Sequence, residues 1–143
     1  MKLSESVRDS ILEHAREADP KEACGLLGGR DGDPPVVLGS IRTPNVADNP
    51  TRRFEIDPEA LLEGHESFEA AGLSLLGFYH SHPVGPSAPS ETDRDGAGWA
   101  NSAVLIASLA DREPVLGAWW FTGETFRSIP LETIESPHGA DST

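Results

Sequence analysis

Apolar residues near the start of the chain recur at helical spacing. Between Ser4 and Asp19 they fall every three or four positions, which predicts an amphipathic helix, at Val7, Ile11, Leu12, Ala15 and Ala18. Ser4 is a suitable N-cap for this helix, and Asp19-Pro20 marks its end. We expect His14, inside the helix, to face solvent.

Short apolar runs bounded by turn residues predict strands. Glu22–Gly29 is expected to be a buried strand that begins with a carboxylate, and it forms a hairpin with 36–38 across the turn residues 30–33. Further strands are expected at 54–56, 73–82, 103–107, 115–121 and 126–130.

Two more helices follow from capping signals. Asp57-Pro58 is expected to begin a helix that runs to about Gly72, with Asp as N-cap and Pro at the first helical position. Ser90 and Asp93 have the spacing of a capping box, which predicts a short helix from Glu91 to about Trp99. The segment 42–53 is irregular, and loops of this length are often functional.

Length and cysteine usage limit the class of protein. A chain of 143 residues suits one domain, which we expect over 1–135, with a small polar tail at 136–143 that we expect to be disordered. A single cysteine excludes an internal disulfide framework and fits a reducing compartment. Because no apolar run approaches the length of a signal sequence or a membrane span, we expect a soluble, cytoplasmic protein without a membrane partner.

The charge balance is strongly acidic. Lys and Arg number 11 against 24 Asp and Glu, a formal net charge of −13. Such a chain would repel a phosphate backbone, so nucleic acid is not expected as a partner. The acids are spread along the sequence, which suits either a halophilic source, where salt screens the repulsion, or an ordinary soluble acidic protein.

The run 73–79 leads directly into His80, Ser81, His82 and Pro83. Side chains two apart in a strand share a face, so the two histidines would point together and could bind one metal ion. Asp93 could add a carboxylate, and two imidazoles with one carboxylate form a common catalytic zinc set that leaves a fourth position for water. The alternative is a pair of surface histidines beside a capping sequence.

A metal hydrolase also needs a group that transfers protons, and Glu22 is the candidate. A carboxylate at the start of an apolar strand is out of place unless it lies in a cleft. The alternative is a solvated glutamate at a strand end.

Glu22, His80-x-His82-Pro83 and Ser90-x-x-Asp93 together resemble the JAMM motif of the MPN-domain metalloproteases, and the flanking segments are similar to its compact prokaryotic, desampylase-like members. The resemblance covers about 3–134. It implies an α/β fold, related to that of cytidine deaminase, with a curved mixed sheet flanked by helices. It also implies one zinc ion held by His80, His82 and Asp93, with Glu22 as general acid/base and Ser90 stabilising the oxyanion.

The same resemblance implies a substrate class. Such enzymes cut the bond between the C-terminal glycine of a ubiquitin-like modifier and a target lysine, and the tail of the modifier would bind as an added strand. Two alternatives remain open: a peptidase that releases cysteine from the C-terminus of a sulfur-carrier protein, and a non-catalytic MPN scaffold. Members of the scaffold type typically lack the ligand set.

The residues also bear on two other kinds of zinc site. A nucleobase deaminase would need H-x-E and P-C-x-x-C, which this chain lacks. A closed structural zinc site would need a fourth ligand such as Cys24 or His65. Cys24 would share a face with Glu22, so its oxidation would hinder catalysis, unless it is a buried, inert thiol.

Arg52-Arg53 is the only adjacent arginine pair in this acidic chain. A ubiquitin-like partner from the same cell would also be acidic, so a basic spot beside the cleft would reduce the repulsion between them. The pair is therefore a candidate substrate contact. The alternative is a solvated pair that balances Asp48 and Glu55.

Overall fold

The computed structural model describes residues 1–96 and 99–136. Most of the predicted tail, residues 137–143, therefore lies outside the described residues. Ser136 is within them, and its Oγ accepts a hydrogen bond from the backbone N–H of Ser6 at 3.0 Å.

The described part of the chain forms eight strands and three helices. The strands are β1 (Lys2–Ser4), β2 (Cys24–Arg30), β3 (Val36–Thr43), β4 (Ser74–His82), β5 (Ser102–Ser108), β6 (Val115–Phe121), β7 (Phe126–Ser128) and β8 (Glu132–Ile134). The helices are α1 (Glu5–Ala18), α2 (Pro58–Ala70) and α3 (Glu91–Gly96).

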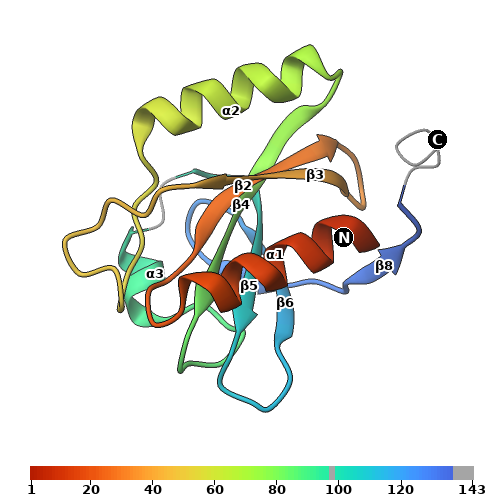
Figure 1. The fold of residues 1–143 in the computed structure, drawn as a ribbon. Coiled ribbons are helices and arrows are strands. Elements are labelled where there is room, and N and C mark those ends of the chain that lie inside the picture. Colours follow the sequence, from red (N-terminus) through yellow and green to blue (C-terminus); the bar gives the residue numbers. More distant parts are fainter. Residues whose placement is uncertain (97–98, 137–143) are drawn as a thin grey trace.

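The strands form one mixed sheet in the order β7-β6-β5-β4-β2-β3-β1-β8. β2 pairs antiparallel with both β3 and β4, whereas β4 and β5 are parallel. Figure 1 shows the strongly twisted sheet with α1 and α2 packed against it. The predicted α/β fold, a curved mixed sheet flanked by helices, is confirmed, and so is the predicted hairpin of β2 and β3.

β2 is buried on both faces, which explains why its sequence is apolar without alternation. Leu27 joins the core cluster that includes Ile11 and Ala15 of α1. The next residue toward the N-terminus, Leu26, lies under α2, where a Cβ on Gly64 would overlap its side chain. The two helices therefore cover opposite faces of the central strands.

The predicted caps differ in their chemistry. Ser4 caps α1 as expected, because its Oγ accepts the backbone N–H of Val7 at 3.3 Å. Asp57 occupies the N-cap position of α2, followed by Pro58, but its side chain makes no capping hydrogen bond.

Several predicted boundaries were wrong. β2 begins at Cys24, so Glu22 precedes the strand instead of starting it. The segment 54–56 is not a strand, and only an isolated bridge joins Ile56 to Asn45. The third helix ends at Gly96, before Trp99, with residues 97–98 outside the described part.

β1, β8 and the partial burial of His14 were not predicted from the sequence. Each of these strands has three residues, too few for an alternation signal, and their partners lie far away in sequence. His14 is half-buried instead of facing solvent, because its Nδ1 hydrogen-bonds the hydroxyl of the buried Tyr79 at 2.6 Å.

Gly77 allows β4 and β5 to approach closely. It lies opposite Ala103 in the parallel pair, and a Cβ built on Gly77 would overlap the backbone carbonyl of Ala103. The substitution Gly77→Ala is expected to lower the free energy of unfolding by about 1–3 kcal/mol or more, because backbone cannot move aside as a flexible side chain can. Urea denaturation measures the change.

Gly39→Ala is the matched control. A Cβ at Gly39 would meet its nearest atom, on Phe68, at an ordinary 3.4 Å. Its cost should stay below about 1 kcal/mol. Equal costs at the two positions would contradict the close-approach explanation for Gly77.

Candidate metal centre

The site begins where β4 ends. His80 and His82 are 2% and 6% exposed, and their Nε2 atoms lie 3.2 Å apart. Both rings point to the same side because they are two residues apart in an extended strand. Pro83 follows directly after the strand ends.

Asp93 reaches these histidines from the first turn of α3. Its Oδ2 lies 3.0 Å from His80 Nε2 and 2.9 Å from His82 Nε2. The same oxygen accepts the backbone N–H of Ser90 at 2.9 Å, and Ser90 Oγ accepts the backbone N–H of Asp93 at 3.0 Å. The capping box is therefore present, and it fixes the carboxylate beside the two imidazoles.

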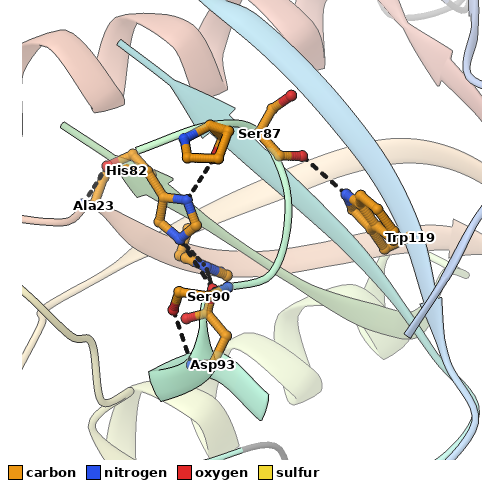
Figure 2. Close-up of polar contacts among 9 residues, drawn as sticks. Ala23, His82, Ser87, Ser90, Asp93 and Trp119 are labelled. Atoms are coloured by element: carbon orange, nitrogen blue, oxygen red, sulfur yellow. Dashed lines mark hydrogen bonds and ion pairs between the residues drawn. The ribbon is translucent and has the colours of Figure 1, made fainter. Parts of the chain in front are cut away.

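The loop between β4 and α3 orients His82. The Nδ1 atom of His82 lies 2.7 Å from the carbonyl oxygen of Pro86. A carbonyl oxygen only accepts, so Nδ1 carries the hydrogen, and in the neutral ring Nε2 keeps the free lone pair. Trp119 Nε1 donates to the carbonyl of Ser87 at 2.9 Å, which ties this loop to β6 (Figure 2).

Glu22 is brought to the same place by β2, the neighbour of β4 in the sheet, because it lies just before the first residue of that strand. Ser81 clamps the residue next to Glu22: Ser81 Oγ accepts the N–H of Ala23 at 2.7 Å, and Ser81 N–H donates to the carbonyl of Ala23 at 3.0 Å. This role of Ser81 was not predicted from the sequence. The sequence signal that could have pointed to Ser81 is its position between the two candidate ligands His80 and His82.

The Glu22 carboxylate is buried without a partner. The residue is 6% exposed, and Oε1 has no hydrogen-bond partner among the described residues. Burial raises the pKa of Glu22 to about 7, and the negative charge of Asp93 adds to the effect, while His82 opposes it. A carboxyl group with a pKa near neutrality can both accept and return a proton.

Glu22, His80, His82 and Asp93 form a group whose ligand atoms all lie within 4.8 Å of one another. The donor set suits a metal ion: ligands about 2.0–2.1 Å from a tetrahedral ion lie about 3.3 Å apart, close to the spacings of the histidine and Asp93 atoms. Burial lowers the pKa of His80, which favours the neutral, metal-binding form. The residues therefore fit a bound metal.

The other predicted residues lie outside this group. Neither Cys24 nor His65 belongs to it, so the described residues offer no support for a closed site built on them. Cys24 is fully buried beside Thr43, and burial raises the pKa of its thiol, which favours the inert interpretation.

Ser90, Arg52 and Arg53 are exposed. Ser90 Oγ uses a lone pair to accept from Asp93, so its hydroxyl hydrogen remains available. Arg53 lines a pocket of about 470 Å³ that reaches His80 and Asp93, whereas Arg52 does not line it. Within the described residues, neither arginine forms an ion pair with Asp48 or Glu55.

Among the described residues, no helix has both the length and the apolar character needed to cross a membrane.

Fold and site together define a small α/β domain with a group of side chains that could hold a metal ion at the end of its central strand. Residues 4–122 match the family of prokaryotic homologs of the JAB domain, and the chain belongs to this family.

Three curated relatives are similar over most of the chain. A desampylase from Haloferax volcanii is 41% identical, covering 92% of this chain and 94% of the relative. A probable TtuB-protein conjugate cleaving protease from Thermus thermophilus is 42% identical, covering 74% and 66%. A CysO-cysteine peptidase from Mycobacterium tuberculosis is 31% identical, covering 72% and 69%.

Solved structures agree with the fold. A protein from Desulfitobacterium hafniense has a TM-score of 0.87 at 33% identity, covering 96% of this chain and 95% of that one. A JAB1/MPN domain protein from Archaeoglobus fulgidus has a TM-score of 0.58 at 24% identity, covering 94% and 100%. The predicted MPN-type domain is confirmed.

The raised pKa of Glu22 predicts a pH-dependent stability in the metal-free protein. Because folding raises the pKa of Glu22 from 4.5 to about 7, the folded state holds the proton more tightly than the unfolded state does. The free energy of unfolding therefore falls as pH rises through this interval. Replacing Glu22 by neutral glutamine should remove this loss of stability. Glu22→Gln is expected to raise the free energy of unfolding by about 3 kcal/mol at pH 8 but only about 1 kcal/mol at pH 5.

Urea denaturation of both metal-free proteins at the two pH values measures this difference. Glu55→Gln, on an exposed side chain, is the control for the removal of one negative charge. If Glu22→Gln raises the free energy of unfolding by the same amount at pH 5 and pH 8, the raised pKa of the buried Glu22 carboxyl is contradicted.

Proposed function

We propose that this protein is a zinc-dependent isopeptidase that hydrolyses the bond between the C-terminal glycine of a ubiquitin-like modifier and a target lysine. In this proposal His80, His82 and Asp93 hold the zinc ion. The observation that carries the proposal is the buried, unpaired carboxylate of Glu22, with its pKa near 7, beside these three donors.

Zinc is proposed because two imidazoles and one carboxylate form a common catalytic zinc set. When bound there, zinc lowers the pKa of its water to about 7 and polarises the scissile carbonyl. The Nδ1–H bond of His82 to Pro86 and the capping bonds of Asp93 hold these side chains in the required orientation.

Glu22 transfers the protons in this proposal. Its Oε1 takes a proton from the attacking water and later gives it to the leaving lysine amine, so the carboxyl returns to its ionised form. Ser90 acts as a donor to the oxyanion through its free hydroxyl hydrogen, a contribution of about 10²–10³ in rate for such donors.

The substrate class and setting rest on the relatives. The desampylase and the TtuB-conjugate protease support a ubiquitin-like partner and its conjugates. The Haloferax relative and the net charge of −13 support a halophilic source. A cytoplasmic location stays a prediction.

A second candidate is the release of cysteine from the C-terminus of a sulfur-carrier protein. The similarity to the CysO-cysteine peptidase favours it. The same residues would serve both reactions, since each breaks an amide bond that follows the C-terminal residue of a carrier. A non-catalytic scaffold is disfavoured because the four-residue group is complete.

Intact-mass measurement separates these functions. The zinc-loaded protein is incubated with a lysine-conjugated ubiquitin-like protein and, separately, with a carrier that bears a C-terminal cysteine. Release of the modifier with its glycine terminus supports the isopeptidase, and loss of one cysteine mass supports the second candidate. Cleavage of neither, in protein verified to contain zinc, would support the scaffold.

Two variants separate the proposed roles within the site. Glu22→Ala is expected to keep about one zinc per chain and lose turnover by about 10²–10⁴-fold or more, whereas His82→Ala should lose both metal and turnover. Elemental analysis and the conjugate assay measure the two properties. Metal loss in both variants would make Glu22 a ligand or a structural residue instead.

The exposed Arg52-Arg53 pair is proposed as a substrate contact near the pocket. The double variant Arg52→Ala/Arg53→Ala is expected to raise KM and weaken the salt dependence for a full conjugate only. A short isopeptide without the folded modifier is the control, because the zinc chemistry is untouched. Equal effects on both substrates, or none, would remove the pair from the recognition surface.

A further inference from the structure

The two histidines of the proposed metal site are supported in different ways. His82 donates from Nδ1 to a backbone carbonyl, the usual device that fixes the plane of a metal-binding imidazole. His80 lacks this support, because its Nδ1 is buried with no hydrogen-bond partner among the described residues. Something else must fix the orientation of the His80 ring.

An aromatic ring lies against it. Phe54 is stacked on His80 with ring centroids 4.3 Å apart and planes 21° from parallel. An imidazole packed flat against a phenyl ring cannot rotate about its χ2 angle without losing that contact. The stack therefore restricts the direction of the His80 Nε2 lone pair.

Phe54 belongs to the irregular loop between β3 and α2, so its own position needs an explanation. Asn45 provides it from within the same loop. The Asn45 Nδ2 lies 3.0 Å from the carbonyl oxygen of Arg53, and Oδ1 accepts the N–H of Glu55 at 3.0 Å. These two groups lie immediately before and after Phe54, so one side chain clamps its backbone on both sides.

The same asparagine also ties the loop to Glu22. Its second amide hydrogen is directed to the carbonyl oxygen of Glu22 at 3.0 Å, and the N–H of Glu22 donates to the carbonyl of Pro50 at 2.7 Å. The loop thus contacts the backbone of Glu22 and the ring of His80 together.

We propose that Phe54 is a positioning residue that fixes the metal-binding orientation of His80 by stacking, and that Asn45 acts through Phe54 by clamping its backbone. The proposal rests on the metal site proposed above. Phe54 replaces, for His80, the hydrogen bond that Pro86 provides for His82.

The test measures metal affinity, which needs no substrate. Cobalt(II) replaces zinc, and its dissociation constant is determined by competition with a chromogenic chelator. Phe54→Leu is expected to weaken cobalt binding about tenfold, the lower range for loss of an outer support, and to change the visible absorption of the cobalt protein. Phe54→Tyr keeps the ring and should restore both properties to within about twofold.

Phe126→Leu is the matched control. Phe126 lines the same pocket but packs on Phe121, with ring centroids 4.9 Å apart. Its cobalt affinity and spectrum should be those of the wild type. Wild-type affinity in Phe54→Leu, or an equal loss in both leucine variants, would overturn the proposal. If Phe54→Leu does not fold, Phe54→Met takes its place with the same expected loss.

A double-mutant cycle tests the role of Asn45. Asn45→Ala should weaken cobalt binding, and Asn45→Ala/Phe54→Leu should lose no more than the larger single loss, because both changes remove the same support. Additive losses would overturn the link between the two residues. A wild-type protein that binds neither cobalt nor zinc would refute the proposed function itself, which separates that failure from this one.

Discussion

The antiparallel pairing of β2 with β4 is the constraint on which the site depends. This pairing places Cys24 opposite His80. Two hydrogen bonds between Ser81 of β4 and Ala23 continue the contact beyond the first residue of β2. Glu22 therefore lies beside the two histidines, although almost sixty residues separate it from them in the sequence. A shift of this pairing by one residue would turn the histidines to the opposite face.

Burial raises the pKa of the Glu22 carboxyl, and the same burial lowers the stability of the fold when the group is ionised. A carboxylate with no partner for Oε1 would be excluded from most protein interiors. Here its desolvation raises the pKa to about 7, where a proton can be taken and returned. The same free energy that disfavours the ionised form in the fold makes the group suitable for proton transfer.

Loops supply the outer support of the site, and the sheet holds them in place. The loop after β4 gives His82 its acceptor and is tied to β6 through Trp119. The loop before α2 gives His80 its stacking partner and is tied together by Asn45. Figure 1 shows this second loop on the same side of the molecule as α3, which carries Asp93.

From the sequence alone, the H-x-H…D spacing, which is a local signal, identified His80, His82 and Asp93 as candidate ligands. The mixed-sheet fold and the role of Glu22 were expected from the resemblance of the whole motif to the JAMM family. The sequence did not determine β1, β8 or the contact of His14 with Tyr79, since three-residue strands and single side-chain contacts depend on partners far along the chain. Nor could it assign Ser81, Asn45 or Phe54. Their effects come from distances and ring planes between segments, which only the packed tertiary structure fixes.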